Sequence, residues 1–259
     1  MSFTTMTKKN FVEFLAPFND VNSLLLSVNS TTTSVSSGTY AMFLRRTLEH
    51  KDGEIGKIAI SDLSILRKFL RTCKAGDDVT LKQQSPHKLC YISSGNKKFH
   101  MPGLNEAHID SQQHVSIFNK IIAQSEESGW KIWPKQKEVI NLIASGSVKT
   151  GDLSSITEML SVVGKDELLT LTVDPTTSSL DVKAGKKAKG RMFASIEMVD
   201  SEGERPATSL FDGVLGEIIP TLPSGEVSLH MGEDSPLLIV SANGDLTVIT
   251  AQDLQEGWG

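Results

Sequence analysis

The stretch FVEFLAPFNDVNSLLLSVNSTTTSV, residues 11–35, aligns without a gap on ITEMLSVVGKDELLTLTVDPTTSSL, residues 156–180. Eight of the 25 aligned positions are identical, and the spacing of apolar residues agrees as well. Each copy begins with apolar residues three or four apart, typical of a helix, and continues with apolar residues two apart, typical of a strand. The match predicts two copies of one α+β unit, although two ordinary α+β segments can also resemble each other by chance.

A looser correspondence extends the repeat. Residues 60–81, ISDLSILRKFLRTCKAGDDVTL, align with residues 210–229, LFDGVLGEIIPTLPSGEVSL, when short gaps are allowed. In both, a predicted helix leads through a glycine turn into a strand, with Ser61 as the expected N-cap of the first of these helices. The second is predicted from the apolar residues Leu210, Phe211, Val214, Leu215 and Ile218. The shared element order favours duplication over chance.

A polar stretch, residues 105–137, separates the two halves and contains one apolar segment. It reads as a connector with one short helix, which places domain 1 at residues 1–104 and domain 2 at residues 138–259. The length of 259 residues fits two domains of roughly 100–150 residues each.

Composition limits the class of protein. With 39% hydrophobic and 22% charged residues, the chain can bury a core, and its formal charge of −5 excludes a general polycation. No apolar run is long enough for a membrane span, and the N-terminus lacks a signal peptide's apolar stretch. Two cysteines exclude a disulfide framework. We therefore expect an intracellular protein.

No catalytic constellation is recognisable in the sequence. The six histidines are scattered without metal-ligand spacing, and neither cysteine has a nucleophile's local signature. We therefore predict no catalytic residue, no metal and no cofactor. The alternative is an α+β hydrolase or transferase with a loop-assembled site, built on His87 or His230 with a nearby Asp. A perturbed titration of either imidazole would favour that alternative.

Basic residues gather on two predicted helices in this acidic chain. Two lysines open the first helix, and a helical wheel places the cations of the second opposite its apolar stripe. Such a face is either a solvated surface or a contact for phosphates. The run KAGKKAKGR, residues 183–191, is either a solvated hairpin loop or a phosphate-contacting loop. The cations on and beside the predicted helices are Lys8, Lys9, Arg67, Lys68, Arg71, Lys74 and Lys149.

Two stretches resemble the proliferating cell nuclear antigen family of DNA sliding clamps. LPSGEVSLHMGEDSPLLIV, residues 222–240, is similar to the last-domain signature of that family, and KAGDDVTLKQQ, residues 74–84, to the matching segment of its first domain. The resemblance covers most of both halves, but only residues 222–240 are specific. The short N-terminus, which is expected to enter a helix almost at once, is more similar to a bacteriophage-type clamp.

The resemblance implies an α+β DNA-clamp fold, with two helices of each domain lining a hole and the subunits closing head to tail as a homotrimer. The implied DNA-binding residues are Lys8, Lys9, Arg67, Lys68, Arg71, Lys74 and Lys149. The implied subunit interface consists of Lys97, Phe99, Met101, Arg191, Phe193 and Ser195. The implied pocket for partner peptides consists of Tyr40, Met42, Leu44, Ile249 and Ala251, although alternating strand residues are also typical of a core. The predicted fourth helix lacks lysine and arginine and departs from an evenly basic lining.

The function implied is that of a processivity factor without catalysis of its own. Its partners would be double-stranded DNA without sequence preference, a replicative DNA polymerase, a clamp loader that uses ATP, and further copies of the chain. It would act in the cytoplasm or nucleoid of a bacterial host, or in the nucleus of a eukaryote. A single-strand-binding module is disfavoured by the 6% aromatic content, because such modules stack bases on aromatic rings.

Overall fold

The structure is a computed structural model that describes residues 1–18, 21–37, 42–84, 89–135, 138–165, 167–185, 190–213 and 215–250. The chain divides into two compact units. Unit 1 runs to Asn119, and unit 2 begins at Lys120 and also takes in residues 40–42. The division falls inside the segment predicted to be a connector.

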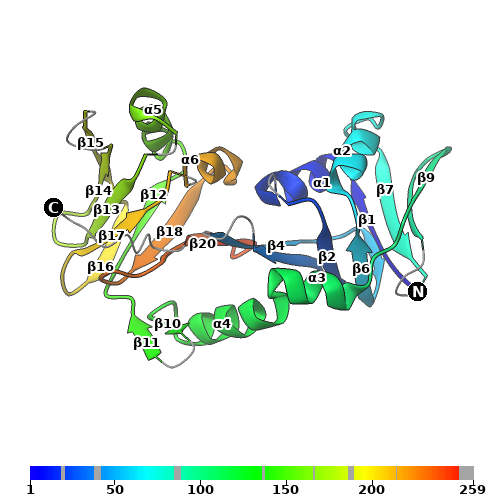
Figure 1. The fold of residues 1–259 in the computed structure, drawn as a ribbon, viewed down its shortest axis with the longest axis horizontal. Helices are drawn as coiled ribbons and strands as arrows, with labels where there is room; N and C mark the ends of the chain where they lie inside the picture. Colours follow the sequence, from blue (N-terminus) through cyan, green and yellow to red (C-terminus); the bar gives the residue numbers. More distant parts are fainter. Residues whose placement is uncertain are drawn as a thin grey trace. The chain divides into compact units, whose positions relative to one another are not determined.

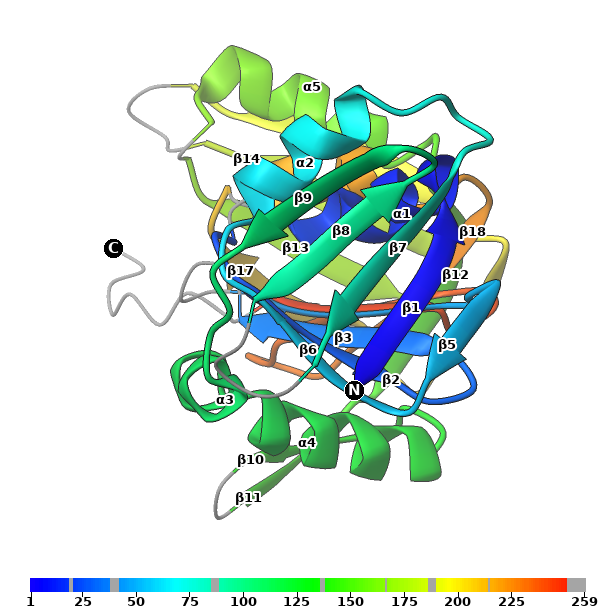
Figure 2. The same cartoon turned by 90° about the vertical axis from the view of Figure 1, so that its right-hand side faces the viewer.

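Unit 1 is built from two antiparallel sheets and three helices (Figure 1). In chain order its elements are β1 (Ser2–Thr7), α1 (Lys8–Leu15), a 3₁₀ turn (Ala16–Phe18), β2 (Leu24–Val28), β3 (Thr32–Ser37), β4 (Met42–Leu48), β5 (Asp52–Glu54), β6 (Gly56–Ile60), α2 (Leu63–Arg71), β7 (Asp78–Gln83), β8 (Cys90–Ser94), β9 (Lys97–Met101) and α3 (Glu106–Gln113). One sheet has the order β5-β1-β7-β8-β9 and is seen face-on in Figure 2. The other joins β4, β3, β2 and β6 in that order.

Unit 2 follows after α4 (Val115–Glu127), the helix in which the division falls. Its further elements are β10 (Ile132–Lys135), β11 (Glu138–Asn141), β12 (Ala144–Lys149), α5 (Ser154–Val163), β13 (Leu169–Asp174), β14 (Ser179–Ala184), β15 (Met192–Glu197), β16 (Asp200–Gly203), β17 (Ala207–Phe211), α6 (Leu215–Ile218), a 3₁₀ turn (Ile219–Thr221), β18 (Glu226–Met231), β19 (Leu237–Ser241) and β20 (Leu246–Thr250). One sheet joins β16, β12, β18, β19 and β20. The other has the order β15-β14-β13-β17.

The strand pairings confirm the predicted duplication. In unit 1, β1 pairs with β5 and β7, and β2 pairs with β3 and β6. In unit 2, β12 pairs with β16 and β18, and β13 pairs with β14 and β17. Even a cross-strand hydroxyl pair recurs, with 2.9 Å between Thr5 Oγ1 and Thr80 Oγ1 and 3.4 Å between Ser147 Oγ and Ser228 Oγ. The chain is therefore an α+β protein made of two copies of one unit.

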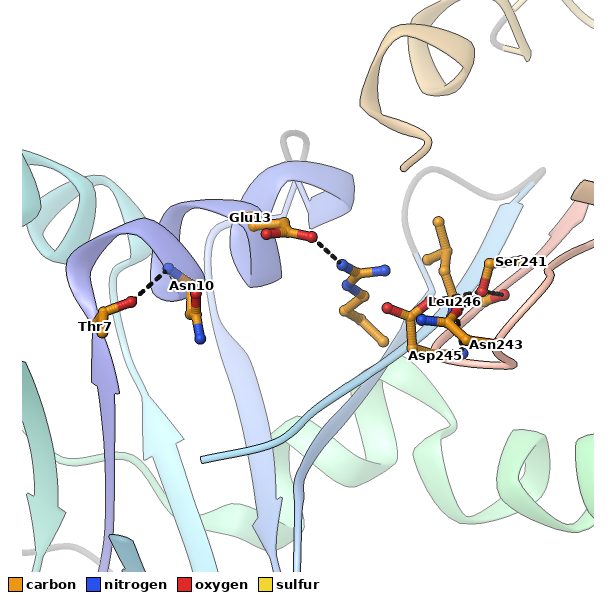
Figure 3. Close-up of polar contacts among 8 residues, drawn as sticks. Thr7, Asn10, Glu13, Ser241, Asn243, Asp245 and Leu246 are labelled. Atoms are coloured by element: carbon orange, nitrogen blue, oxygen red, sulfur yellow. Dashed lines mark hydrogen bonds and ion pairs between the residues drawn. The ribbon is translucent and has the colours of Figure 1, made fainter. Parts of the chain in front are cut away.

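Helix α1 begins and ends where the sequence predicts. The Thr7 side chain caps its first turn by accepting a hydrogen bond from the Asn10 backbone N–H at 3.2 Å (Figure 3). Pro17 lies in the 3₁₀ turn that closes the helix. Phe11 and Phe14 are buried, so α1 contributes two large aromatic rings to the core of unit 1.

Two details near the helix starts differ from the expectation. The N-cap of α2 is Asp62, not Ser61, because Asp62 Oδ1 accepts hydrogen bonds from the backbone N–H groups of Ser64 at 2.8 Å and Ile65 at 3.1 Å. The hydrogen bond from the Ser64 hydroxyl lowers the pKa of Asp62 below its usual value. The second is an omission, because α1 begins at Lys8 as expected but strand β1, which precedes it and pairs with two strands, was not predicted.

The fourth helix is shorter than the apolar pattern predicts. Leu210 and Phe211 belong to β17, where Phe211 pairs with Leu169 of β13. Helix α6 has only four residues. Gly213 separates the two elements at a place where a Cβ would clash with the Lys165 carbonyl oxygen. An apolar run fits a buried strand as well as a helix, and the glycine ends the strand here.

The predicted connector contains two helices, where the sequence indicated one. Helix α3 is capped by the Asn105 side chain, which accepts a hydrogen bond from the Ala107 backbone N–H at 3.0 Å. Ile109 of α3 is buried against Leu25 of β2 and Ala59 of β6, so α3 covers one face of that sheet. A helix with a single buried apolar residue has almost no hydrophobic periodicity, which is why the sequence did not predict it.

Candidate nucleic-acid interface

Helices α1 and α2 pack against each other in unit 1 and carry most of the predicted DNA-binding residues. Of the apolar residues of α2 predicted to face inward, Leu63, Leu66 and Leu70 are buried and Phe69 is half-buried. Among the predicted cations, Lys9, Lys68, Arg71 and Lys74 are exposed, whereas Lys8 and Arg67 are half-buried. The structure therefore brings six of the seven predicted residues together on two neighbouring helices and the segment that follows α2.

Arg67 has a structural role that distinguishes it from the neighbouring cations. One guanidinium nitrogen, Nη2, donates hydrogen bonds to the backbone carbonyls of Leu15 at 3.2 Å and Phe18 at 2.8 Å. The Leu15 carbonyl belongs to the last residue of α1, and the Phe18 carbonyl belongs to the 3₁₀ turn that follows and also accepts a hydrogen bond from the Val21 backbone N–H at 3.3 Å. A cation is favoured at such a helix end. Arg67 thus binds α2 to the C-terminal end of α1 and fixes the geometry of the basic face.

A groove of about 370 Å³ lies between the two helices. Its apolar lining comes from Val12, Leu15, Ala16 and Leu70. All of its charged lining residues are cations, namely Lys8, Arg67 and Arg71. Positive charge beside a shallow apolar groove suits the anionic, ridged backbone of a nucleic acid and offers no set of hydrogen-bonding groups for reading bases.

A buried arginine that the sequence analysis did not identify contacts helix α1 from the strand β4. Arg46 of β4 is 1% exposed, and its Nη2 lies 3.2 Å from Glu13 Oε1 on α1 (Figure 3). The ion pair ties the helix to the sheet beneath it. A charged residue within an alternating strand is typical of a solvent-facing position. The one sequence feature that pointed to this contact was Glu13, which is identical to Glu158 at the aligned position of the repeat.

Lys149, the remaining predicted DNA-binding residue, is the last residue of β12 in unit 2 and is exposed. It lines a larger groove together with Asp152, Glu158 and Glu226. Its surroundings are therefore acidic, unlike those of the six cations in unit 1.

The first predicted interface strand is β9, at the edge of its sheet, with β8 as its one described neighbour. Phe99 is 38% exposed, a large fraction for an aromatic ring on a strand. The Lys97 ammonium donates a hydrogen bond to the Thr72 carbonyl. Met101 differs from the expectation, because its side chain is buried and therefore contributes to the core of unit 1.

The second predicted interface strand is β15, also an edge strand of its sheet in the described chain. Phe193 is 70% exposed, and Arg191 precedes the strand and is exposed. The Ser195 hydroxyl donates a hydrogen bond to Asp181 Oδ1 at 2.6 Å. Both predicted strands therefore present an aromatic ring at an edge whose backbone groups can pair with a further strand.

The predicted peptide pocket is only partly described. Ile249 of β20 is 1% exposed, so its side chain belongs to the core of unit 2. Met42 and Leu44 lie on β4 with side chains outside the described part of the chain, and Tyr40 and Ala251 lie outside it altogether. The pocket stays a prediction.

The structure describes one of the two histidines of the enzymatic alternative, His230. His230 stacks on Trp130 with 6.1 Å between ring centroids, and burial is the one cause that lowers its pKa, to about 4. The shift therefore reflects packing without a carboxylate partner. Burial likewise raises the pKa of the Cys90 thiol to about 12, which disfavours a thiolate nucleophile. His87 lies outside the described residues.

The described residues contain no cluster of three or more His, Cys, Asp or Glu residues arranged to hold a metal ion. Within the same residues, no helix is both long and apolar enough to cross a membrane.

The pKa of His230 predicts a pH dependence of stability. Between pH 6.5 and about 4 the unfolded chain binds a proton on this residue that the folded chain does not bind. Stability is therefore lost as the pH falls through this window, by about 3 kcal/mol when the loss is complete. Urea unfolding followed by tryptophan fluorescence between pH 7 and pH 4 measures the loss. In His230→Leu, the free energy of unfolding lost between pH 7 and pH 4 should be smaller by about 3 kcal/mol. An unchanged loss would contradict the assignment of this pH dependence to His230.

The arrangement of elements defines a fold that several solved structures share. The sequence itself matches no protein-family model and no curated protein. The structure is similar to PCNA from A. fulgidus, solved with the C-terminal region of FEN-1 bound, at a TM-score of 0.74 and 14% identity, covering 99% of this chain and 100% of that chain. PCNA from Thermococcus kodakaraensis is similar at a TM-score of 0.71 and 15% identity, covering 98% and 100% of the two chains.

A bacterial clamp is similar as well. The β subunit of DNA polymerase III from Borrelia burgdorferi matches at a TM-score of 0.71 and 14% identity, over 98% of this chain and 64% of that longer chain. The chain therefore has the sliding-clamp fold, as the resemblance of residues 222–240 implied. The two-domain PCNA chains match over their whole length, and the bacterial chain matches over about two thirds.

Proposed function

We propose that this protein is a sliding clamp that encircles duplex DNA and tethers a DNA polymerase to its template. The observation that carries the proposal is the match of the whole chain to whole PCNA chains, in which both duplicated units are included. The basic face of α1 and α2 supports it, because a clamp that slides needs diffuse positive potential toward phosphates and no base-specific contacts. The enzymatic alternative is not favoured, because burial alone accounts for the lowered pKa of His230.

The proposed assembly is a ring of three subunits joined head to tail. A head-to-tail interface uses two different surfaces of each subunit. It makes a ring when the rotation that relates one subunit to the next returns to the first subunit. The edge strands β9 and β15 are the two surfaces we assign to this interface. Pairing them buries Phe99 and Phe193 and protects two exposed sheet edges. The proposed partners beyond the ring are a replicative polymerase and an ATP-dependent clamp loader.

The proposed function predicts longer polymerase products. With a polymerase, its clamp loader and ATP on a singly primed circular template, adding the protein should lengthen the products made in one binding event by at least about tenfold. A tethered polymerase rebinds its primer end before it diffuses away, because tethering raises its local concentration. Product length on a denaturing gel with excess competitor template measures the effect. Unchanged length under these conditions would contradict the proposal.

A further inference from the structure

The duplication allows the two units to be compared residue by residue. Helices α1 and α2 occupy the same places in unit 1 as α5 and α6 in unit 2, between equivalent strands. Yet their charges differ in sign. Helices α1 and α2 contain five cations and one acidic residue, whereas α5 and α6 contain two acidic residues and no lysine or arginine. The units share a backbone pattern and differ in the electrostatics of this face.

The grooves of the two helix pairs differ in the same way. The charged lining residues of the unit 1 groove are Lys8, Arg67 and Arg71. The groove beside α5 and α6, about 780 Å³, is lined by Lys149 and by the acidic Asp152, Glu158 and Glu226. Asp152 and Glu158 are exposed, so their carboxylates are available to repel a nearby anion. A phosphate that approaches this groove meets more negative than positive charge.

We propose that unit 1 alone binds the DNA backbone, through the α1–α2 face, and that the α5–α6 face of unit 2 makes no attractive phosphate contact. The inference rests on the proposed function and refines it. Each subunit of the ring then provides one DNA-binding face instead of two. Exposed charges act over about one Debye length, roughly 8 Å at physiological salt, so each face is governed by the charges on it and beside it.

The consequence is a difference in salt dependence between matched variants. Each lost phosphate contact lowers the slope of log affinity against log salt concentration by about 0.9. Lys68 and Arg71 are exposed on α2, and Lys149 and Lys165 are exposed next to α5. Neutralising the first pair removes two contacts from the proposed face. Neutralising the second pair removes the same number of charges from unit 2.

The experiment is fluorescence anisotropy with a labelled 30-base-pair linear duplex and the full-length protein, between 50 and 200 mM salt. For Lys68→Gln with Arg71→Gln we expect a slope shallower by about 2 and an affinity roughly ten- to thirtyfold lower at 150 mM salt. For Lys149→Gln with Lys165→Gln we expect less than a twofold change. A second pair in unit 1, Lys9→Gln with Lys74→Gln, should also weaken binding, which guards against a local effect of one pair.

A fourth variant pair tests the basic run of residues 183–191 through Lys183→Gln with Arg191→Gln, for which we expect less than a twofold change. Equal losses from either unit 2 variant and from the unit 1 variants would overturn the inference and leave the clamp function standing. A wild-type protein without salt-dependent duplex binding would overturn both. Light scattering and thermal unfolding of every variant verify that only surface charge has changed.

Discussion

Phe193→Lys is expected to convert the assembled protein into monomers at micromolar concentration. Phe193 is 70% exposed on the edge strand β15, where the proposed interface pairs it with β9 of the next subunit. Strand β9 carries Lys97 and Lys98, both exposed. A lysine at position 193 therefore adds repulsion between like charges to the loss of the aromatic side chain. The loss of a buried aromatic anchor and the new like-charge contact together should weaken association by about 100-fold or more, roughly 3 kcal/mol.

Sedimentation velocity across a concentration series measures this change. The wild type should sediment as a species of about three times 28.1 kDa, and the variant near the monomer mass. Val139→Lys is the matched control, because Val139 is 59% exposed on β11 and lies outside the proposed interface. An assembled Phe193→Lys protein, or a control that dissociates to the same extent, would remove β15 from the interface.

Phe11→Ala and Ile156→Ala are expected to destabilise the two units separately. The two residues align in the repeat, and they are 0% and 1% exposed on α1 and α5. Removing Phe11 should cost about 3–5 kcal/mol and removing Ile156 about 2–5 kcal/mol, since each leaves a cavity in a close-packed core. Each unit has its own hydrophobic core, so we expect the loss of protection to remain largely in the unit that carries the substitution.

Native-state hydrogen exchange is the appropriate measurement, because a two-unit chain need not unfold in one step. Phe11→Ala should increase amide exchange in β2 and β7 while β13 and β18 keep their protection, and Ile156→Ala should do the reverse. Val12→Ala serves as a surface control on α1, where the side chain is 47% exposed. Equal loss of protection in both units would show that they unfold together and would contradict two independent cores.

Much of the fold was predictable because its main signals are local. The helices at Lys8–Leu15 and Leu63–Arg71 have apolar residues at helical spacing, and the structure places both where the pattern predicts. Gly95 and Gly244 lie between the paired strands β8 and β9 and the paired strands β19 and β20, and both adopt positive φ, a conformation that favours glycine. Short, polar elements gave no such signal. Strand β5, for example, is three residues long and has no apolar residue at all, and it is held by its pairing with β1.

The basic face was predictable in part, for the same reason. Helical geometry alone places Lys68 and Arg71 on the outer side of α2, and both are exposed. Arg67 donates hydrogen bonds to carbonyls about 50 positions earlier in the chain. Arg46 contacts a carboxylate 33 positions away. Contacts between residues far apart in sequence leave no periodic pattern, so only the folded chain reveals them.

Retention on circular DNA tests the clamp proposal most directly. Labelled protein is loaded onto a nicked circular plasmid with loader and ATP, and bound protein is separated by gel filtration at 0.5 M salt, before and after one restriction cut. At this salt concentration ordinary phosphate contacts are weak, and a closed ring is held by topology. The account predicts that the protein stays with the circle and is released once the DNA is linear. Equal retention on circular and linear DNA would contradict encirclement.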